Sequence, residues 1–177
     1  MSENRVDPTV AGLFLVGFIT LFFGLLGINL YGDSTDSGLL LVAFDFIGVI
    51  GILMVMFSYM AGKAGNAYAT ALFAFIAVAL FGVSYGAGAG DNAAIVFYAL
   101  ALFFVVFALV GAMIGAPKML VILLLLVALL YLFVGFFFSG SSNVDVWALM
   151  FGIFGLLSFL LATYMAVGLG TQKLPVF

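Results

Sequence analysis

The stretch MLVILLLLVALLYLFVGFFF, at residues 119–138, decides the fold of this chain. It carries no charged side chain, and a helix needs about 20 apolar residues to cross a hydrocarbon core of about 30 Å. Lys118 precedes the stretch, and Ser139 and Gly140 follow it, so polar or turn-forming residues bound it on both sides. These features predict a transmembrane helix rather than a buried helix of a water-soluble domain.

Similar apolar runs occur along the whole chain, separated by short segments rich in glycine and aspartate. They predict transmembrane helices at residues 11–31, 39–60, 67–85, 93–114, 119–138 and 146–168. The short connections make successive helices antiparallel. We therefore expect an all-α, polytopic membrane protein. Residues 1–177 should form a single domain of six transmembrane helices, inserted in the plasma membrane as an integral multi-pass protein.

The composition excludes several classes of function. Hydrophobic residues make up 68% of the chain and charged residues 6%, whereas a soluble domain carries about 25% charged residues. The chain contains neither cysteine nor histidine, which excludes thiolate chemistry and removes the commonest metal ligand. We therefore expect no metal site, no cofactor and no catalytic residue. With only four lysines and arginines, nucleic acid is not an expected partner.

The basic residues predict the orientation in the membrane. Arg5, Lys63, Lys118 and Lys173 all lie on one side of a six-helix topology, in the two tails and in the second and fourth connections. Short loops with basic residues are retained in the cytoplasm. We therefore expect both termini in the cytoplasm.

Asp45 is the only side chain well inside a predicted helix that is charged at neutral pH. An intramembrane carboxylate is costly, so it is a candidate for a substrate contact or a proton relay. The alternative is a residue of the outer half of the helix that reaches water or bonds a neighbouring hydroxyl. An enzyme with an intramembrane aspartyl site would need two converging carboxylates, and the helices offer only Asp45.

Small residues recur along the third and fourth predicted helices. Ala67, Ala71 and Ala74 form one stripe on the third helix. The fourth helix carries a comparable stripe at Ala101, Ala108, Ala112 and Gly115, and Gly111 with Gly115 forms a small-xxx-small pair. Small residues let membrane helices approach closely. The stripes indicate either helix packing alone or a narrow path between closely apposed helices.

Three short motifs, in order along the chain, resemble those of the acetate uptake transporter family, the succinate-acetate permease-like proteins. They are DPTVAGL at residues 7–13, which keeps the proline, glycine and leucine of the family's opening pattern, GN at 65–66 with TA at 70–71, and GTQKLP at 170–175. The first and third motifs depart from the family patterns at Asp7, Val10 and Thr171.

The resemblance implies a homo-oligomer, a hexamer, in which each protomer carries its own path for acetate and similar short carboxylates. No basic side chain lies inside a predicted helix, so backbone amides at the start of the first helix would hold the carboxylate. The family's constriction would fall near Val16, Phe75 and Val127. Together with the intramembrane carboxylate, the candidate substrate-binding residues are Asp7, Pro8, Gly12, Leu13, Val16, Asp45, Asn66, Thr70, Phe75 and Val127.

We accordingly expect a channel or transporter for acetate and similar short monocarboxylates, with succinate as a further substrate and proton linkage as a further property to test. One alternative is a channel for small neutral solutes such as urea or short amides. Another is a structural subunit that transports nothing, for which the small-residue stripes would be interfaces only.

Overall fold

The computed structural model describes residues 8–29, 37–86, 93–140, 142–171 and 175, with backbone only at 37–44 and 85–86. The described residues form six helices and no strand: α1 Pro8–Gly27, α2 Ser37–Lys63, α3 Ala67–Gly86, α4 Ala93–Met113, α5 Lys118–Phe138 and α6 Val144–Thr171. Each of them is long and apolar enough to cross a membrane. The predicted all-α, six-helix membrane fold is confirmed.

Local residue chemistry sets the helix ends, which differ by a few residues from the predicted ones. α1 begins at Pro8 rather than at residue 11, because proline at the first helical position gives up no hydrogen bond. It ends at Gly27, and Asn29 takes a left-handed conformation with φ of 57°. Asn66 caps α3, since its side-chain oxygen accepts a hydrogen bond from the amide of Ala69 at 3.0 Å.

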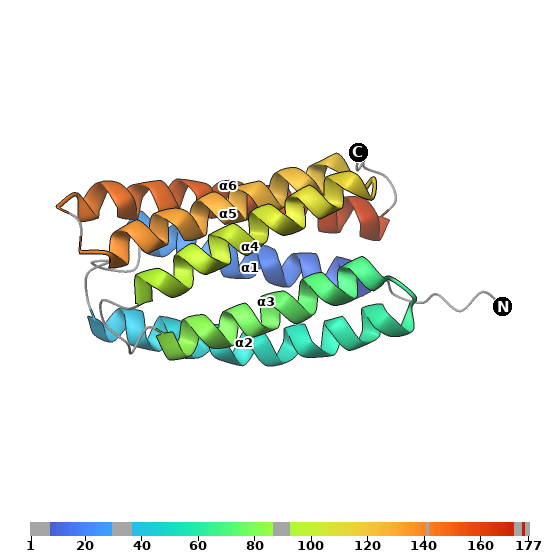
Figure 1. Ribbon diagram of the computed structural model, residues 1–177, viewed down its shortest axis with the longest axis horizontal. Coiled ribbons are helices and arrows are strands. Elements are labelled where there is room, and N and C mark those ends of the chain that lie inside the picture. Colours follow the sequence, from blue (N-terminus) through green and yellow to red (C-terminus); the bar gives the residue numbers. More distant parts are fainter. Residues whose placement is uncertain (1–7, 30–36, 87–92, 141, 172–174, 176–177) are drawn as a thin grey trace.

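The helices run side by side along the long axis of the molecule (Figure 1). The starts of α1, α3 and α5 lie together with the ends of α2, α4 and α6, and we call this the first end of the bundle. Lys63 and Lys118 lie at the first end and Asp145 at the opposite, second end. Arg5 and Lys173 are outside the described residues, and the cytoplasmic location of the termini stays a prediction.

Glycines bring α1 and α6 into backbone contact. A Cβ atom on Gly27 would lie 2.5 Å from the carbonyl oxygen of Ala148 and 2.6 Å from the Cα of Gly152. One on Gly155 would lie 2.6 Å from the amide nitrogen of Gly24. The α1–α6 pair is thus packed backbone against backbone, which only small residues at the contact allow.

Many large apolar side chains point outward, among them Met113, Val78 and Ile95, which are 85%, 69% and 67% exposed. In water such a surface would aggregate, whereas in a bilayer it faces lipid tails. The outer surface therefore agrees with membrane lipid as the surrounding medium.

Candidate functional site

A vestibule lies at the first end of the bundle. Its volume, measured as the space open to the centre of a water-sized sphere, is about 320 Å³. Asn66, Gly115 and Pro117 on its rim are exposed. The lining residues come from α1, α3, α5, α6 and the α4–α5 turn: Thr9, Leu13, Asn66, Tyr68, Ala69, Leu72, Phe73, Ile114, Gly115, Ala116, Pro117, Leu120, Met165 and Leu169.

Three helices start around this vestibule. Thr9, Asn66 and Pro117 lie at or next to the N-termini of α1, α3 and α5. The N-terminal turn of a helix presents unpaired amides and a partial positive charge, and the N-cap residue of α5, Pro117, makes no side-chain capping hydrogen bond. The arrangement favours negatively charged groups at the mouth.

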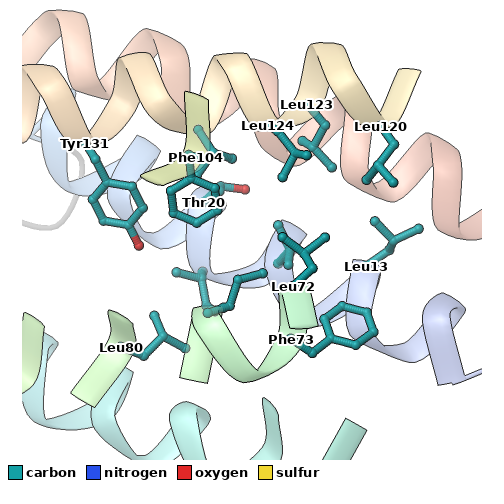
Figure 2. A pocket seen from close by; sticks show the side chains of 14 residues that line it. Leu13, Thr20, Leu72, Phe73, Leu80, Phe104, Leu120, Leu123, Leu124 and Tyr131 are labelled. Atoms are coloured by element: carbon teal, nitrogen blue, oxygen red, sulfur yellow. The ribbon is translucent and has the colours of Figure 1, made fainter. Parts of the chain in front are cut away.

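A smaller inner cavity lies deeper in the bundle (Figure 2). Its volume by the same measure is about 30 Å³, room for two or three water-sized groups at about 10–15 Å³ each. Residues of α1, α3, α4 and α5 line it: Leu13, Val16, Ile19, Thr20, Leu72, Phe73, Ile76, Leu80, Phe104, Leu120, Leu123, Leu124, Val127 and Tyr131.

Four side chains line both spaces, and we call them the neck: Leu13, Leu72, Phe73 and Leu120. All are apolar, and Phe73 is only 2% exposed. The ring of Phe73 lies directly on the backbone of α1 at Gly12, where a Cβ atom would overlap it. Glycine at position 12 therefore gives this ring its place in the neck. Apolar constrictions of this kind gate by excluding water.

Two side chains bring polar atoms to the inner cavity. The Thr20 hydroxyl donates a hydrogen bond to the carbonyl oxygen of Gly17 in its own helix at 3.0 Å. The Tyr131 hydroxyl points into the cavity (Figure 2), and no described residue forms a hydrogen bond with it. None of the described lining residues is an acid, a lysine or an arginine.

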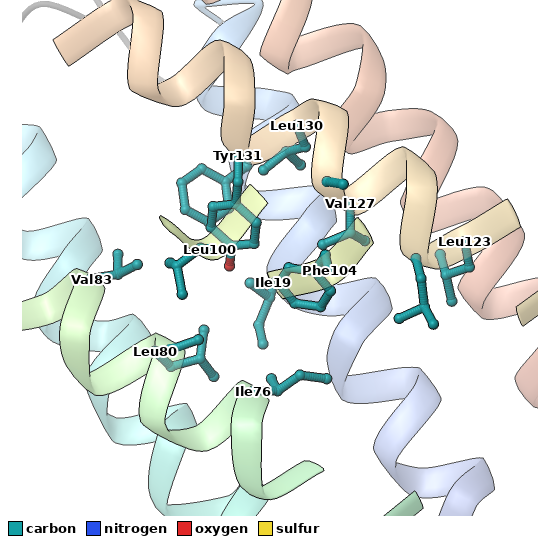
Figure 3. Close-up of a cluster of buried hydrophobic side chains, with 14 of the residues drawn as sticks. Ile19, Ile76, Leu80, Val83, Leu100, Phe104, Leu123, Val127, Leu130 and Tyr131 are labelled. Atoms are coloured by element: carbon teal, nitrogen blue, oxygen red, sulfur yellow. The ribbon is translucent and has the colours of Figure 1, made fainter. Parts of the chain in front are cut away.

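Aromatic rings close the inner cavity toward the second end. Tyr131 stacks on Phe104 with ring centroids 5.5 Å apart and on Phe97 at 6.2 Å, and the edge of Phe23 meets it at 5.9 Å. Phe97 in turn stacks on Phe138 at 5.2 Å. Figure 3 shows Tyr131 and Phe104 among the aliphatic side chains around them. We call these five rings the aromatic plug. In this conformation the vestibule is open at the first end, the neck separates it from the inner cavity, and the plug closes the inner cavity toward the second end.

Several of the predicted site residues lie along this pathway. Leu13 is part of the neck, and Val16 and Val127 line the inner cavity. Gly12 lies beneath the ring of Phe73, and Asn66 is on the rim of the vestibule. Pro8 is buried at the start of α1. Asp7 lies outside the described residues.

The structure does not bring Phe75 to the pathway, which corrects its predicted place in the constriction. Its ring packs against Phe103, Phe104 and Phe107 of α4 at centroid distances of 5.1–5.4 Å. Two residues along a helix turn the side chain by about 200°, so Phe73, and not Phe75, points into the neck.

Asp45 and Thr70 also lie away from the two cavities. Asp45 is exposed on α2. The Thr70 hydroxyl donates to the Asn66 carbonyl oxygen at 2.8 Å, and its own carbonyl accepts from Ser58 at 2.9 Å. Thr70 borders a shallow surface groove between α2 and α3 instead.

The site prediction omitted Thr20, Phe73 and Tyr131. Thr20 and Tyr131 carried a usable signal, since each places a hydroxyl at membrane depth in an otherwise apolar run. Phe73 carried none, because its helix holds phenylalanine on more than one face.

Comparisons with known proteins agree with this architecture. No family model and no curated protein matches the sequence. Among solved structures, the bacterial acetate channel SatP superimposes with a TM-score of 0.77 at 17% sequence identity, covering 98% of this chain and 100% of that one. The chain therefore has, over almost its whole length, the six-helix fold of a bacterial acetate channel.

Proposed function

We propose that this protein is a plasma-membrane channel or transporter for acetate and similar short monocarboxylates. The observation that carries the proposal is a vestibule and an inner cavity that share the neck residues, within a chain that has the fold of an acetate channel. The N-termini of α1, α3 and α5 around the vestibule would attract carboxylates from solution, because their first-turn amides carry a partial positive charge.

The size of the inner cavity supports a short substrate. Space for only two or three water-sized groups suits the shortest carboxylic acids. A four-carbon dicarboxylate such as succinate would be too long for it and would bring a second charge among apolar side chains. We therefore place succinate outside the preferred substrates of this conformation.

Transport assays in liposomes test the proposal. Purified protein should take up radiolabelled acetate faster than protein-free liposomes, with saturation and with inhibition by propionate. Val127→Trp, which fills the inner cavity, should remove most of this flux while the protein still elutes as a folded species. Acetate uptake no faster than in protein-free liposomes, at every pH tested, would overturn the proposal.

A channel for neutral solutes is the second candidate, and the wholly uncharged lining of the inner cavity favours it. Urea and acetamide uptake, measured in the same liposomes, separates the two. Urea flux without acetate flux would assign the protein to neutral solutes.

We also propose that the protein forms a homo-oligomer, a hexamer by its resemblance to the family. Ala67, Ala71 and Ala74 are exposed along the groove between α2 and α3, where a second copy could approach closely. Native mass spectrometry from a mild detergent should show multiples of the 18.7 kDa chain. A monomer that retains acetate flux in lipid nanodiscs would contradict this.

A further inference from the structure

The polar chemistry of the inner cavity consists of one free donor and one acceptor. The hydrogen of the Thr20 hydroxyl is used by the Gly17 carbonyl, so the oxygen of Thr20 offers only its acceptor capacity. The Tyr131 hydroxyl has no hydrogen-bond partner among the described residues and can donate into the cavity. Both side chains are buried, at 3% and 4% exposure.

A single small solute would fill the cavity that both groups border. Thr20 and Tyr131 line the same cavity, which holds two or three water-sized groups. Thr20 lies one turn before Phe23 on α1, and the ring of Phe23 contacts the ring of Tyr131 at 5.9 Å. In Figure 2 the Tyr131 hydroxyl lies on the cavity side of α5.

The aromatic plug holds the donor in place. The ring of Tyr131 lies nearly parallel to Phe104 on α4, with an interplanar angle of 8°, and to Phe97 at 18°. Its hydroxyl points away from α5 toward α3 (Figure 3). A ring held by stacked neighbours keeps its hydroxyl in one position, which is what recognition of a small solute requires.

A donor and an acceptor together match an undissociated carboxylic acid. Its carbonyl oxygen accepts from Tyr131, and its O–H donates to Thr20. A carboxylate anion has acceptors only, so it could not pair with the Thr20 oxygen, and its full charge would lie among hydrocarbon side chains without a cation. A primary amide, with one carbonyl and N–H donors, fits as the acid does.

We propose that Tyr131 and Thr20 are specificity-determining residues that admit the undissociated short-chain acid, and its neutral amide analogue, through the inner cavity and reject the carboxylate anion. The inference rests on the proposed function and names the form of the substrate that crosses. Carboxylates gathered at the vestibule would take up a proton before they pass the neck.

The expected pH dependence comes from the substrate. Tyr131 is the only titratable side chain among the described residues that line the inner cavity, on α1, α3, α4 and α5 alike. A simple carboxylic acid ionises near the pKa of a glutamic acid side chain, about 4.3. At fixed total acetate, the protein-dependent initial rate should therefore rise about tenfold for each unit that external pH falls between 7.5 and 5.5.

Acetate and acetamide uptake at several external pH values, with the membrane potential clamped by potassium and valinomycin, tests the inference. Acetate flux should follow the undissociated acid and ignore the potential, and acetamide flux should ignore both. Tyr131→Phe keeps the stacked ring and removes only the donor, so both fluxes should fall about tenfold. Thr20→Val should act similarly, and Thr20→Ser should lower flux less than Thr20→Val.

Tyr98→Phe is the matched control. Tyr98 is also in a membrane-spanning helix, but it packs against Gly135 and Phe136 and lies outside both cavities. Its hydroxyl should be dispensable for both solutes. Acetate flux that follows total acetate, responds to the potential and survives Tyr131→Phe would overturn this inference alone. No acetate flux above protein-free liposomes at any pH would instead overturn the proposed function.

Discussion

Helix α1 contacts α6 and α3, on two of its sides, in opposite ways. Toward α6, Gly24 and Gly27 lie close to backbone atoms of the facing helix. The backbones of α1 and α6 therefore approach each other directly there. Toward α3, Gly12 lies against the far end of a side chain, the ring of Phe73. Glycine therefore makes room for a fixed backbone contact with α6 on one side of α1. On the other side it makes room for a phenylalanine ring of α3 that can rotate.

The difference bears on how a pathway can open in a tightly packed bundle. Backbone atoms cannot move out of each other's way without moving whole helices, whereas a phenylalanine ring can rotate about its side-chain bonds. We infer that the α1–α6 pair is a rigid part of the bundle and that the neck is the adjustable part of the pathway. Substitutions on the two sides of α1 should therefore fail in different ways.

The largest effect is expected on the rigid side. Gly27→Ala would place a methyl group 2.5 Å from the Ala148 carbonyl oxygen, and we expect it to destabilise the protein by about 3 kcal/mol. Thermal unfolding followed by the fluorescence of Trp147, the single tryptophan, which packs on Phe136, measures the change. Acetate flux per folded molecule should be unaffected by comparison.

Gly82→Ala provides the control for Gly27→Ala. A Cβ atom there would meet only Val96, at 3.9 Å, and alanine is the better helix former, so stability should hold or rise by up to about 1 kcal/mol. If Gly27→Ala were as stable as Gly82→Ala, the close α1–α6 contact would not be the rigid element we describe.

Gly12→Ala should act on transport instead. The added methyl group takes the space of the Phe73 ring, which must turn from α1 into the neck, and we expect acetate flux to fall about tenfold with little loss of stability. In a Phe73→Ala background the same change should have almost no effect, because the ring is gone. Equal losses in both backgrounds would show that Gly12 acts independently of Phe73.

The membrane makes most of the fold predictable from sequence. Each helix has to be long and apolar, so length and hydropathy alone locate the six runs, residues 119–138 most clearly of all. Helix ends are less predictable, because they depend on single residues such as Pro8 and Asn29. Pro8 is an example, because it starts α1 three residues before the predicted apolar run begins.

The site was predictable only where a motif or a polar atom marked it. Leu13, Val16 and Val127 were reached through the family resemblance, and all three line the inner cavity. The family resemblance points to Phe75, and the sequence of α3 alone does not correct this to Phe73, because lipid and protein interior are both apolar and the faces of the helix look alike. In a water-soluble helix the contrast between polar and apolar faces would have separated them.

Phe73→Ala alone tests whether the ring in the neck limits the size of the acid that passes. Removing the ring widens the neck, so we expect four-carbon acids such as butyrate to be taken up several-fold faster relative to acetate. Competition between labelled acetate and unlabelled acids of increasing length measures this. Phe75→Ala is the matched control, since its ring lies against α4, and it should leave the size preference unchanged. A change of preference with Phe75→Ala only would reverse the assignment of the two rings.

The smallest effect on transport is expected at Asp45, which lies on α2 and takes part in neither the α1–α6 contact nor the neck. It is exposed on α2 and borders neither the vestibule nor the inner cavity, so a proton relayed through it would not reach the substrate there. We expect Asp45→Asn to change the acetate rate less than about twofold between pH 5.5 and 7.5, with the same dependence on pH as the unmodified protein, because that dependence belongs to the acid itself. A shifted or flattened pH profile would mean that the Asp45 carboxylate on α2 controls protonation of the substrate. The neck and the inner cavity alone would then not select the form of the acid that crosses.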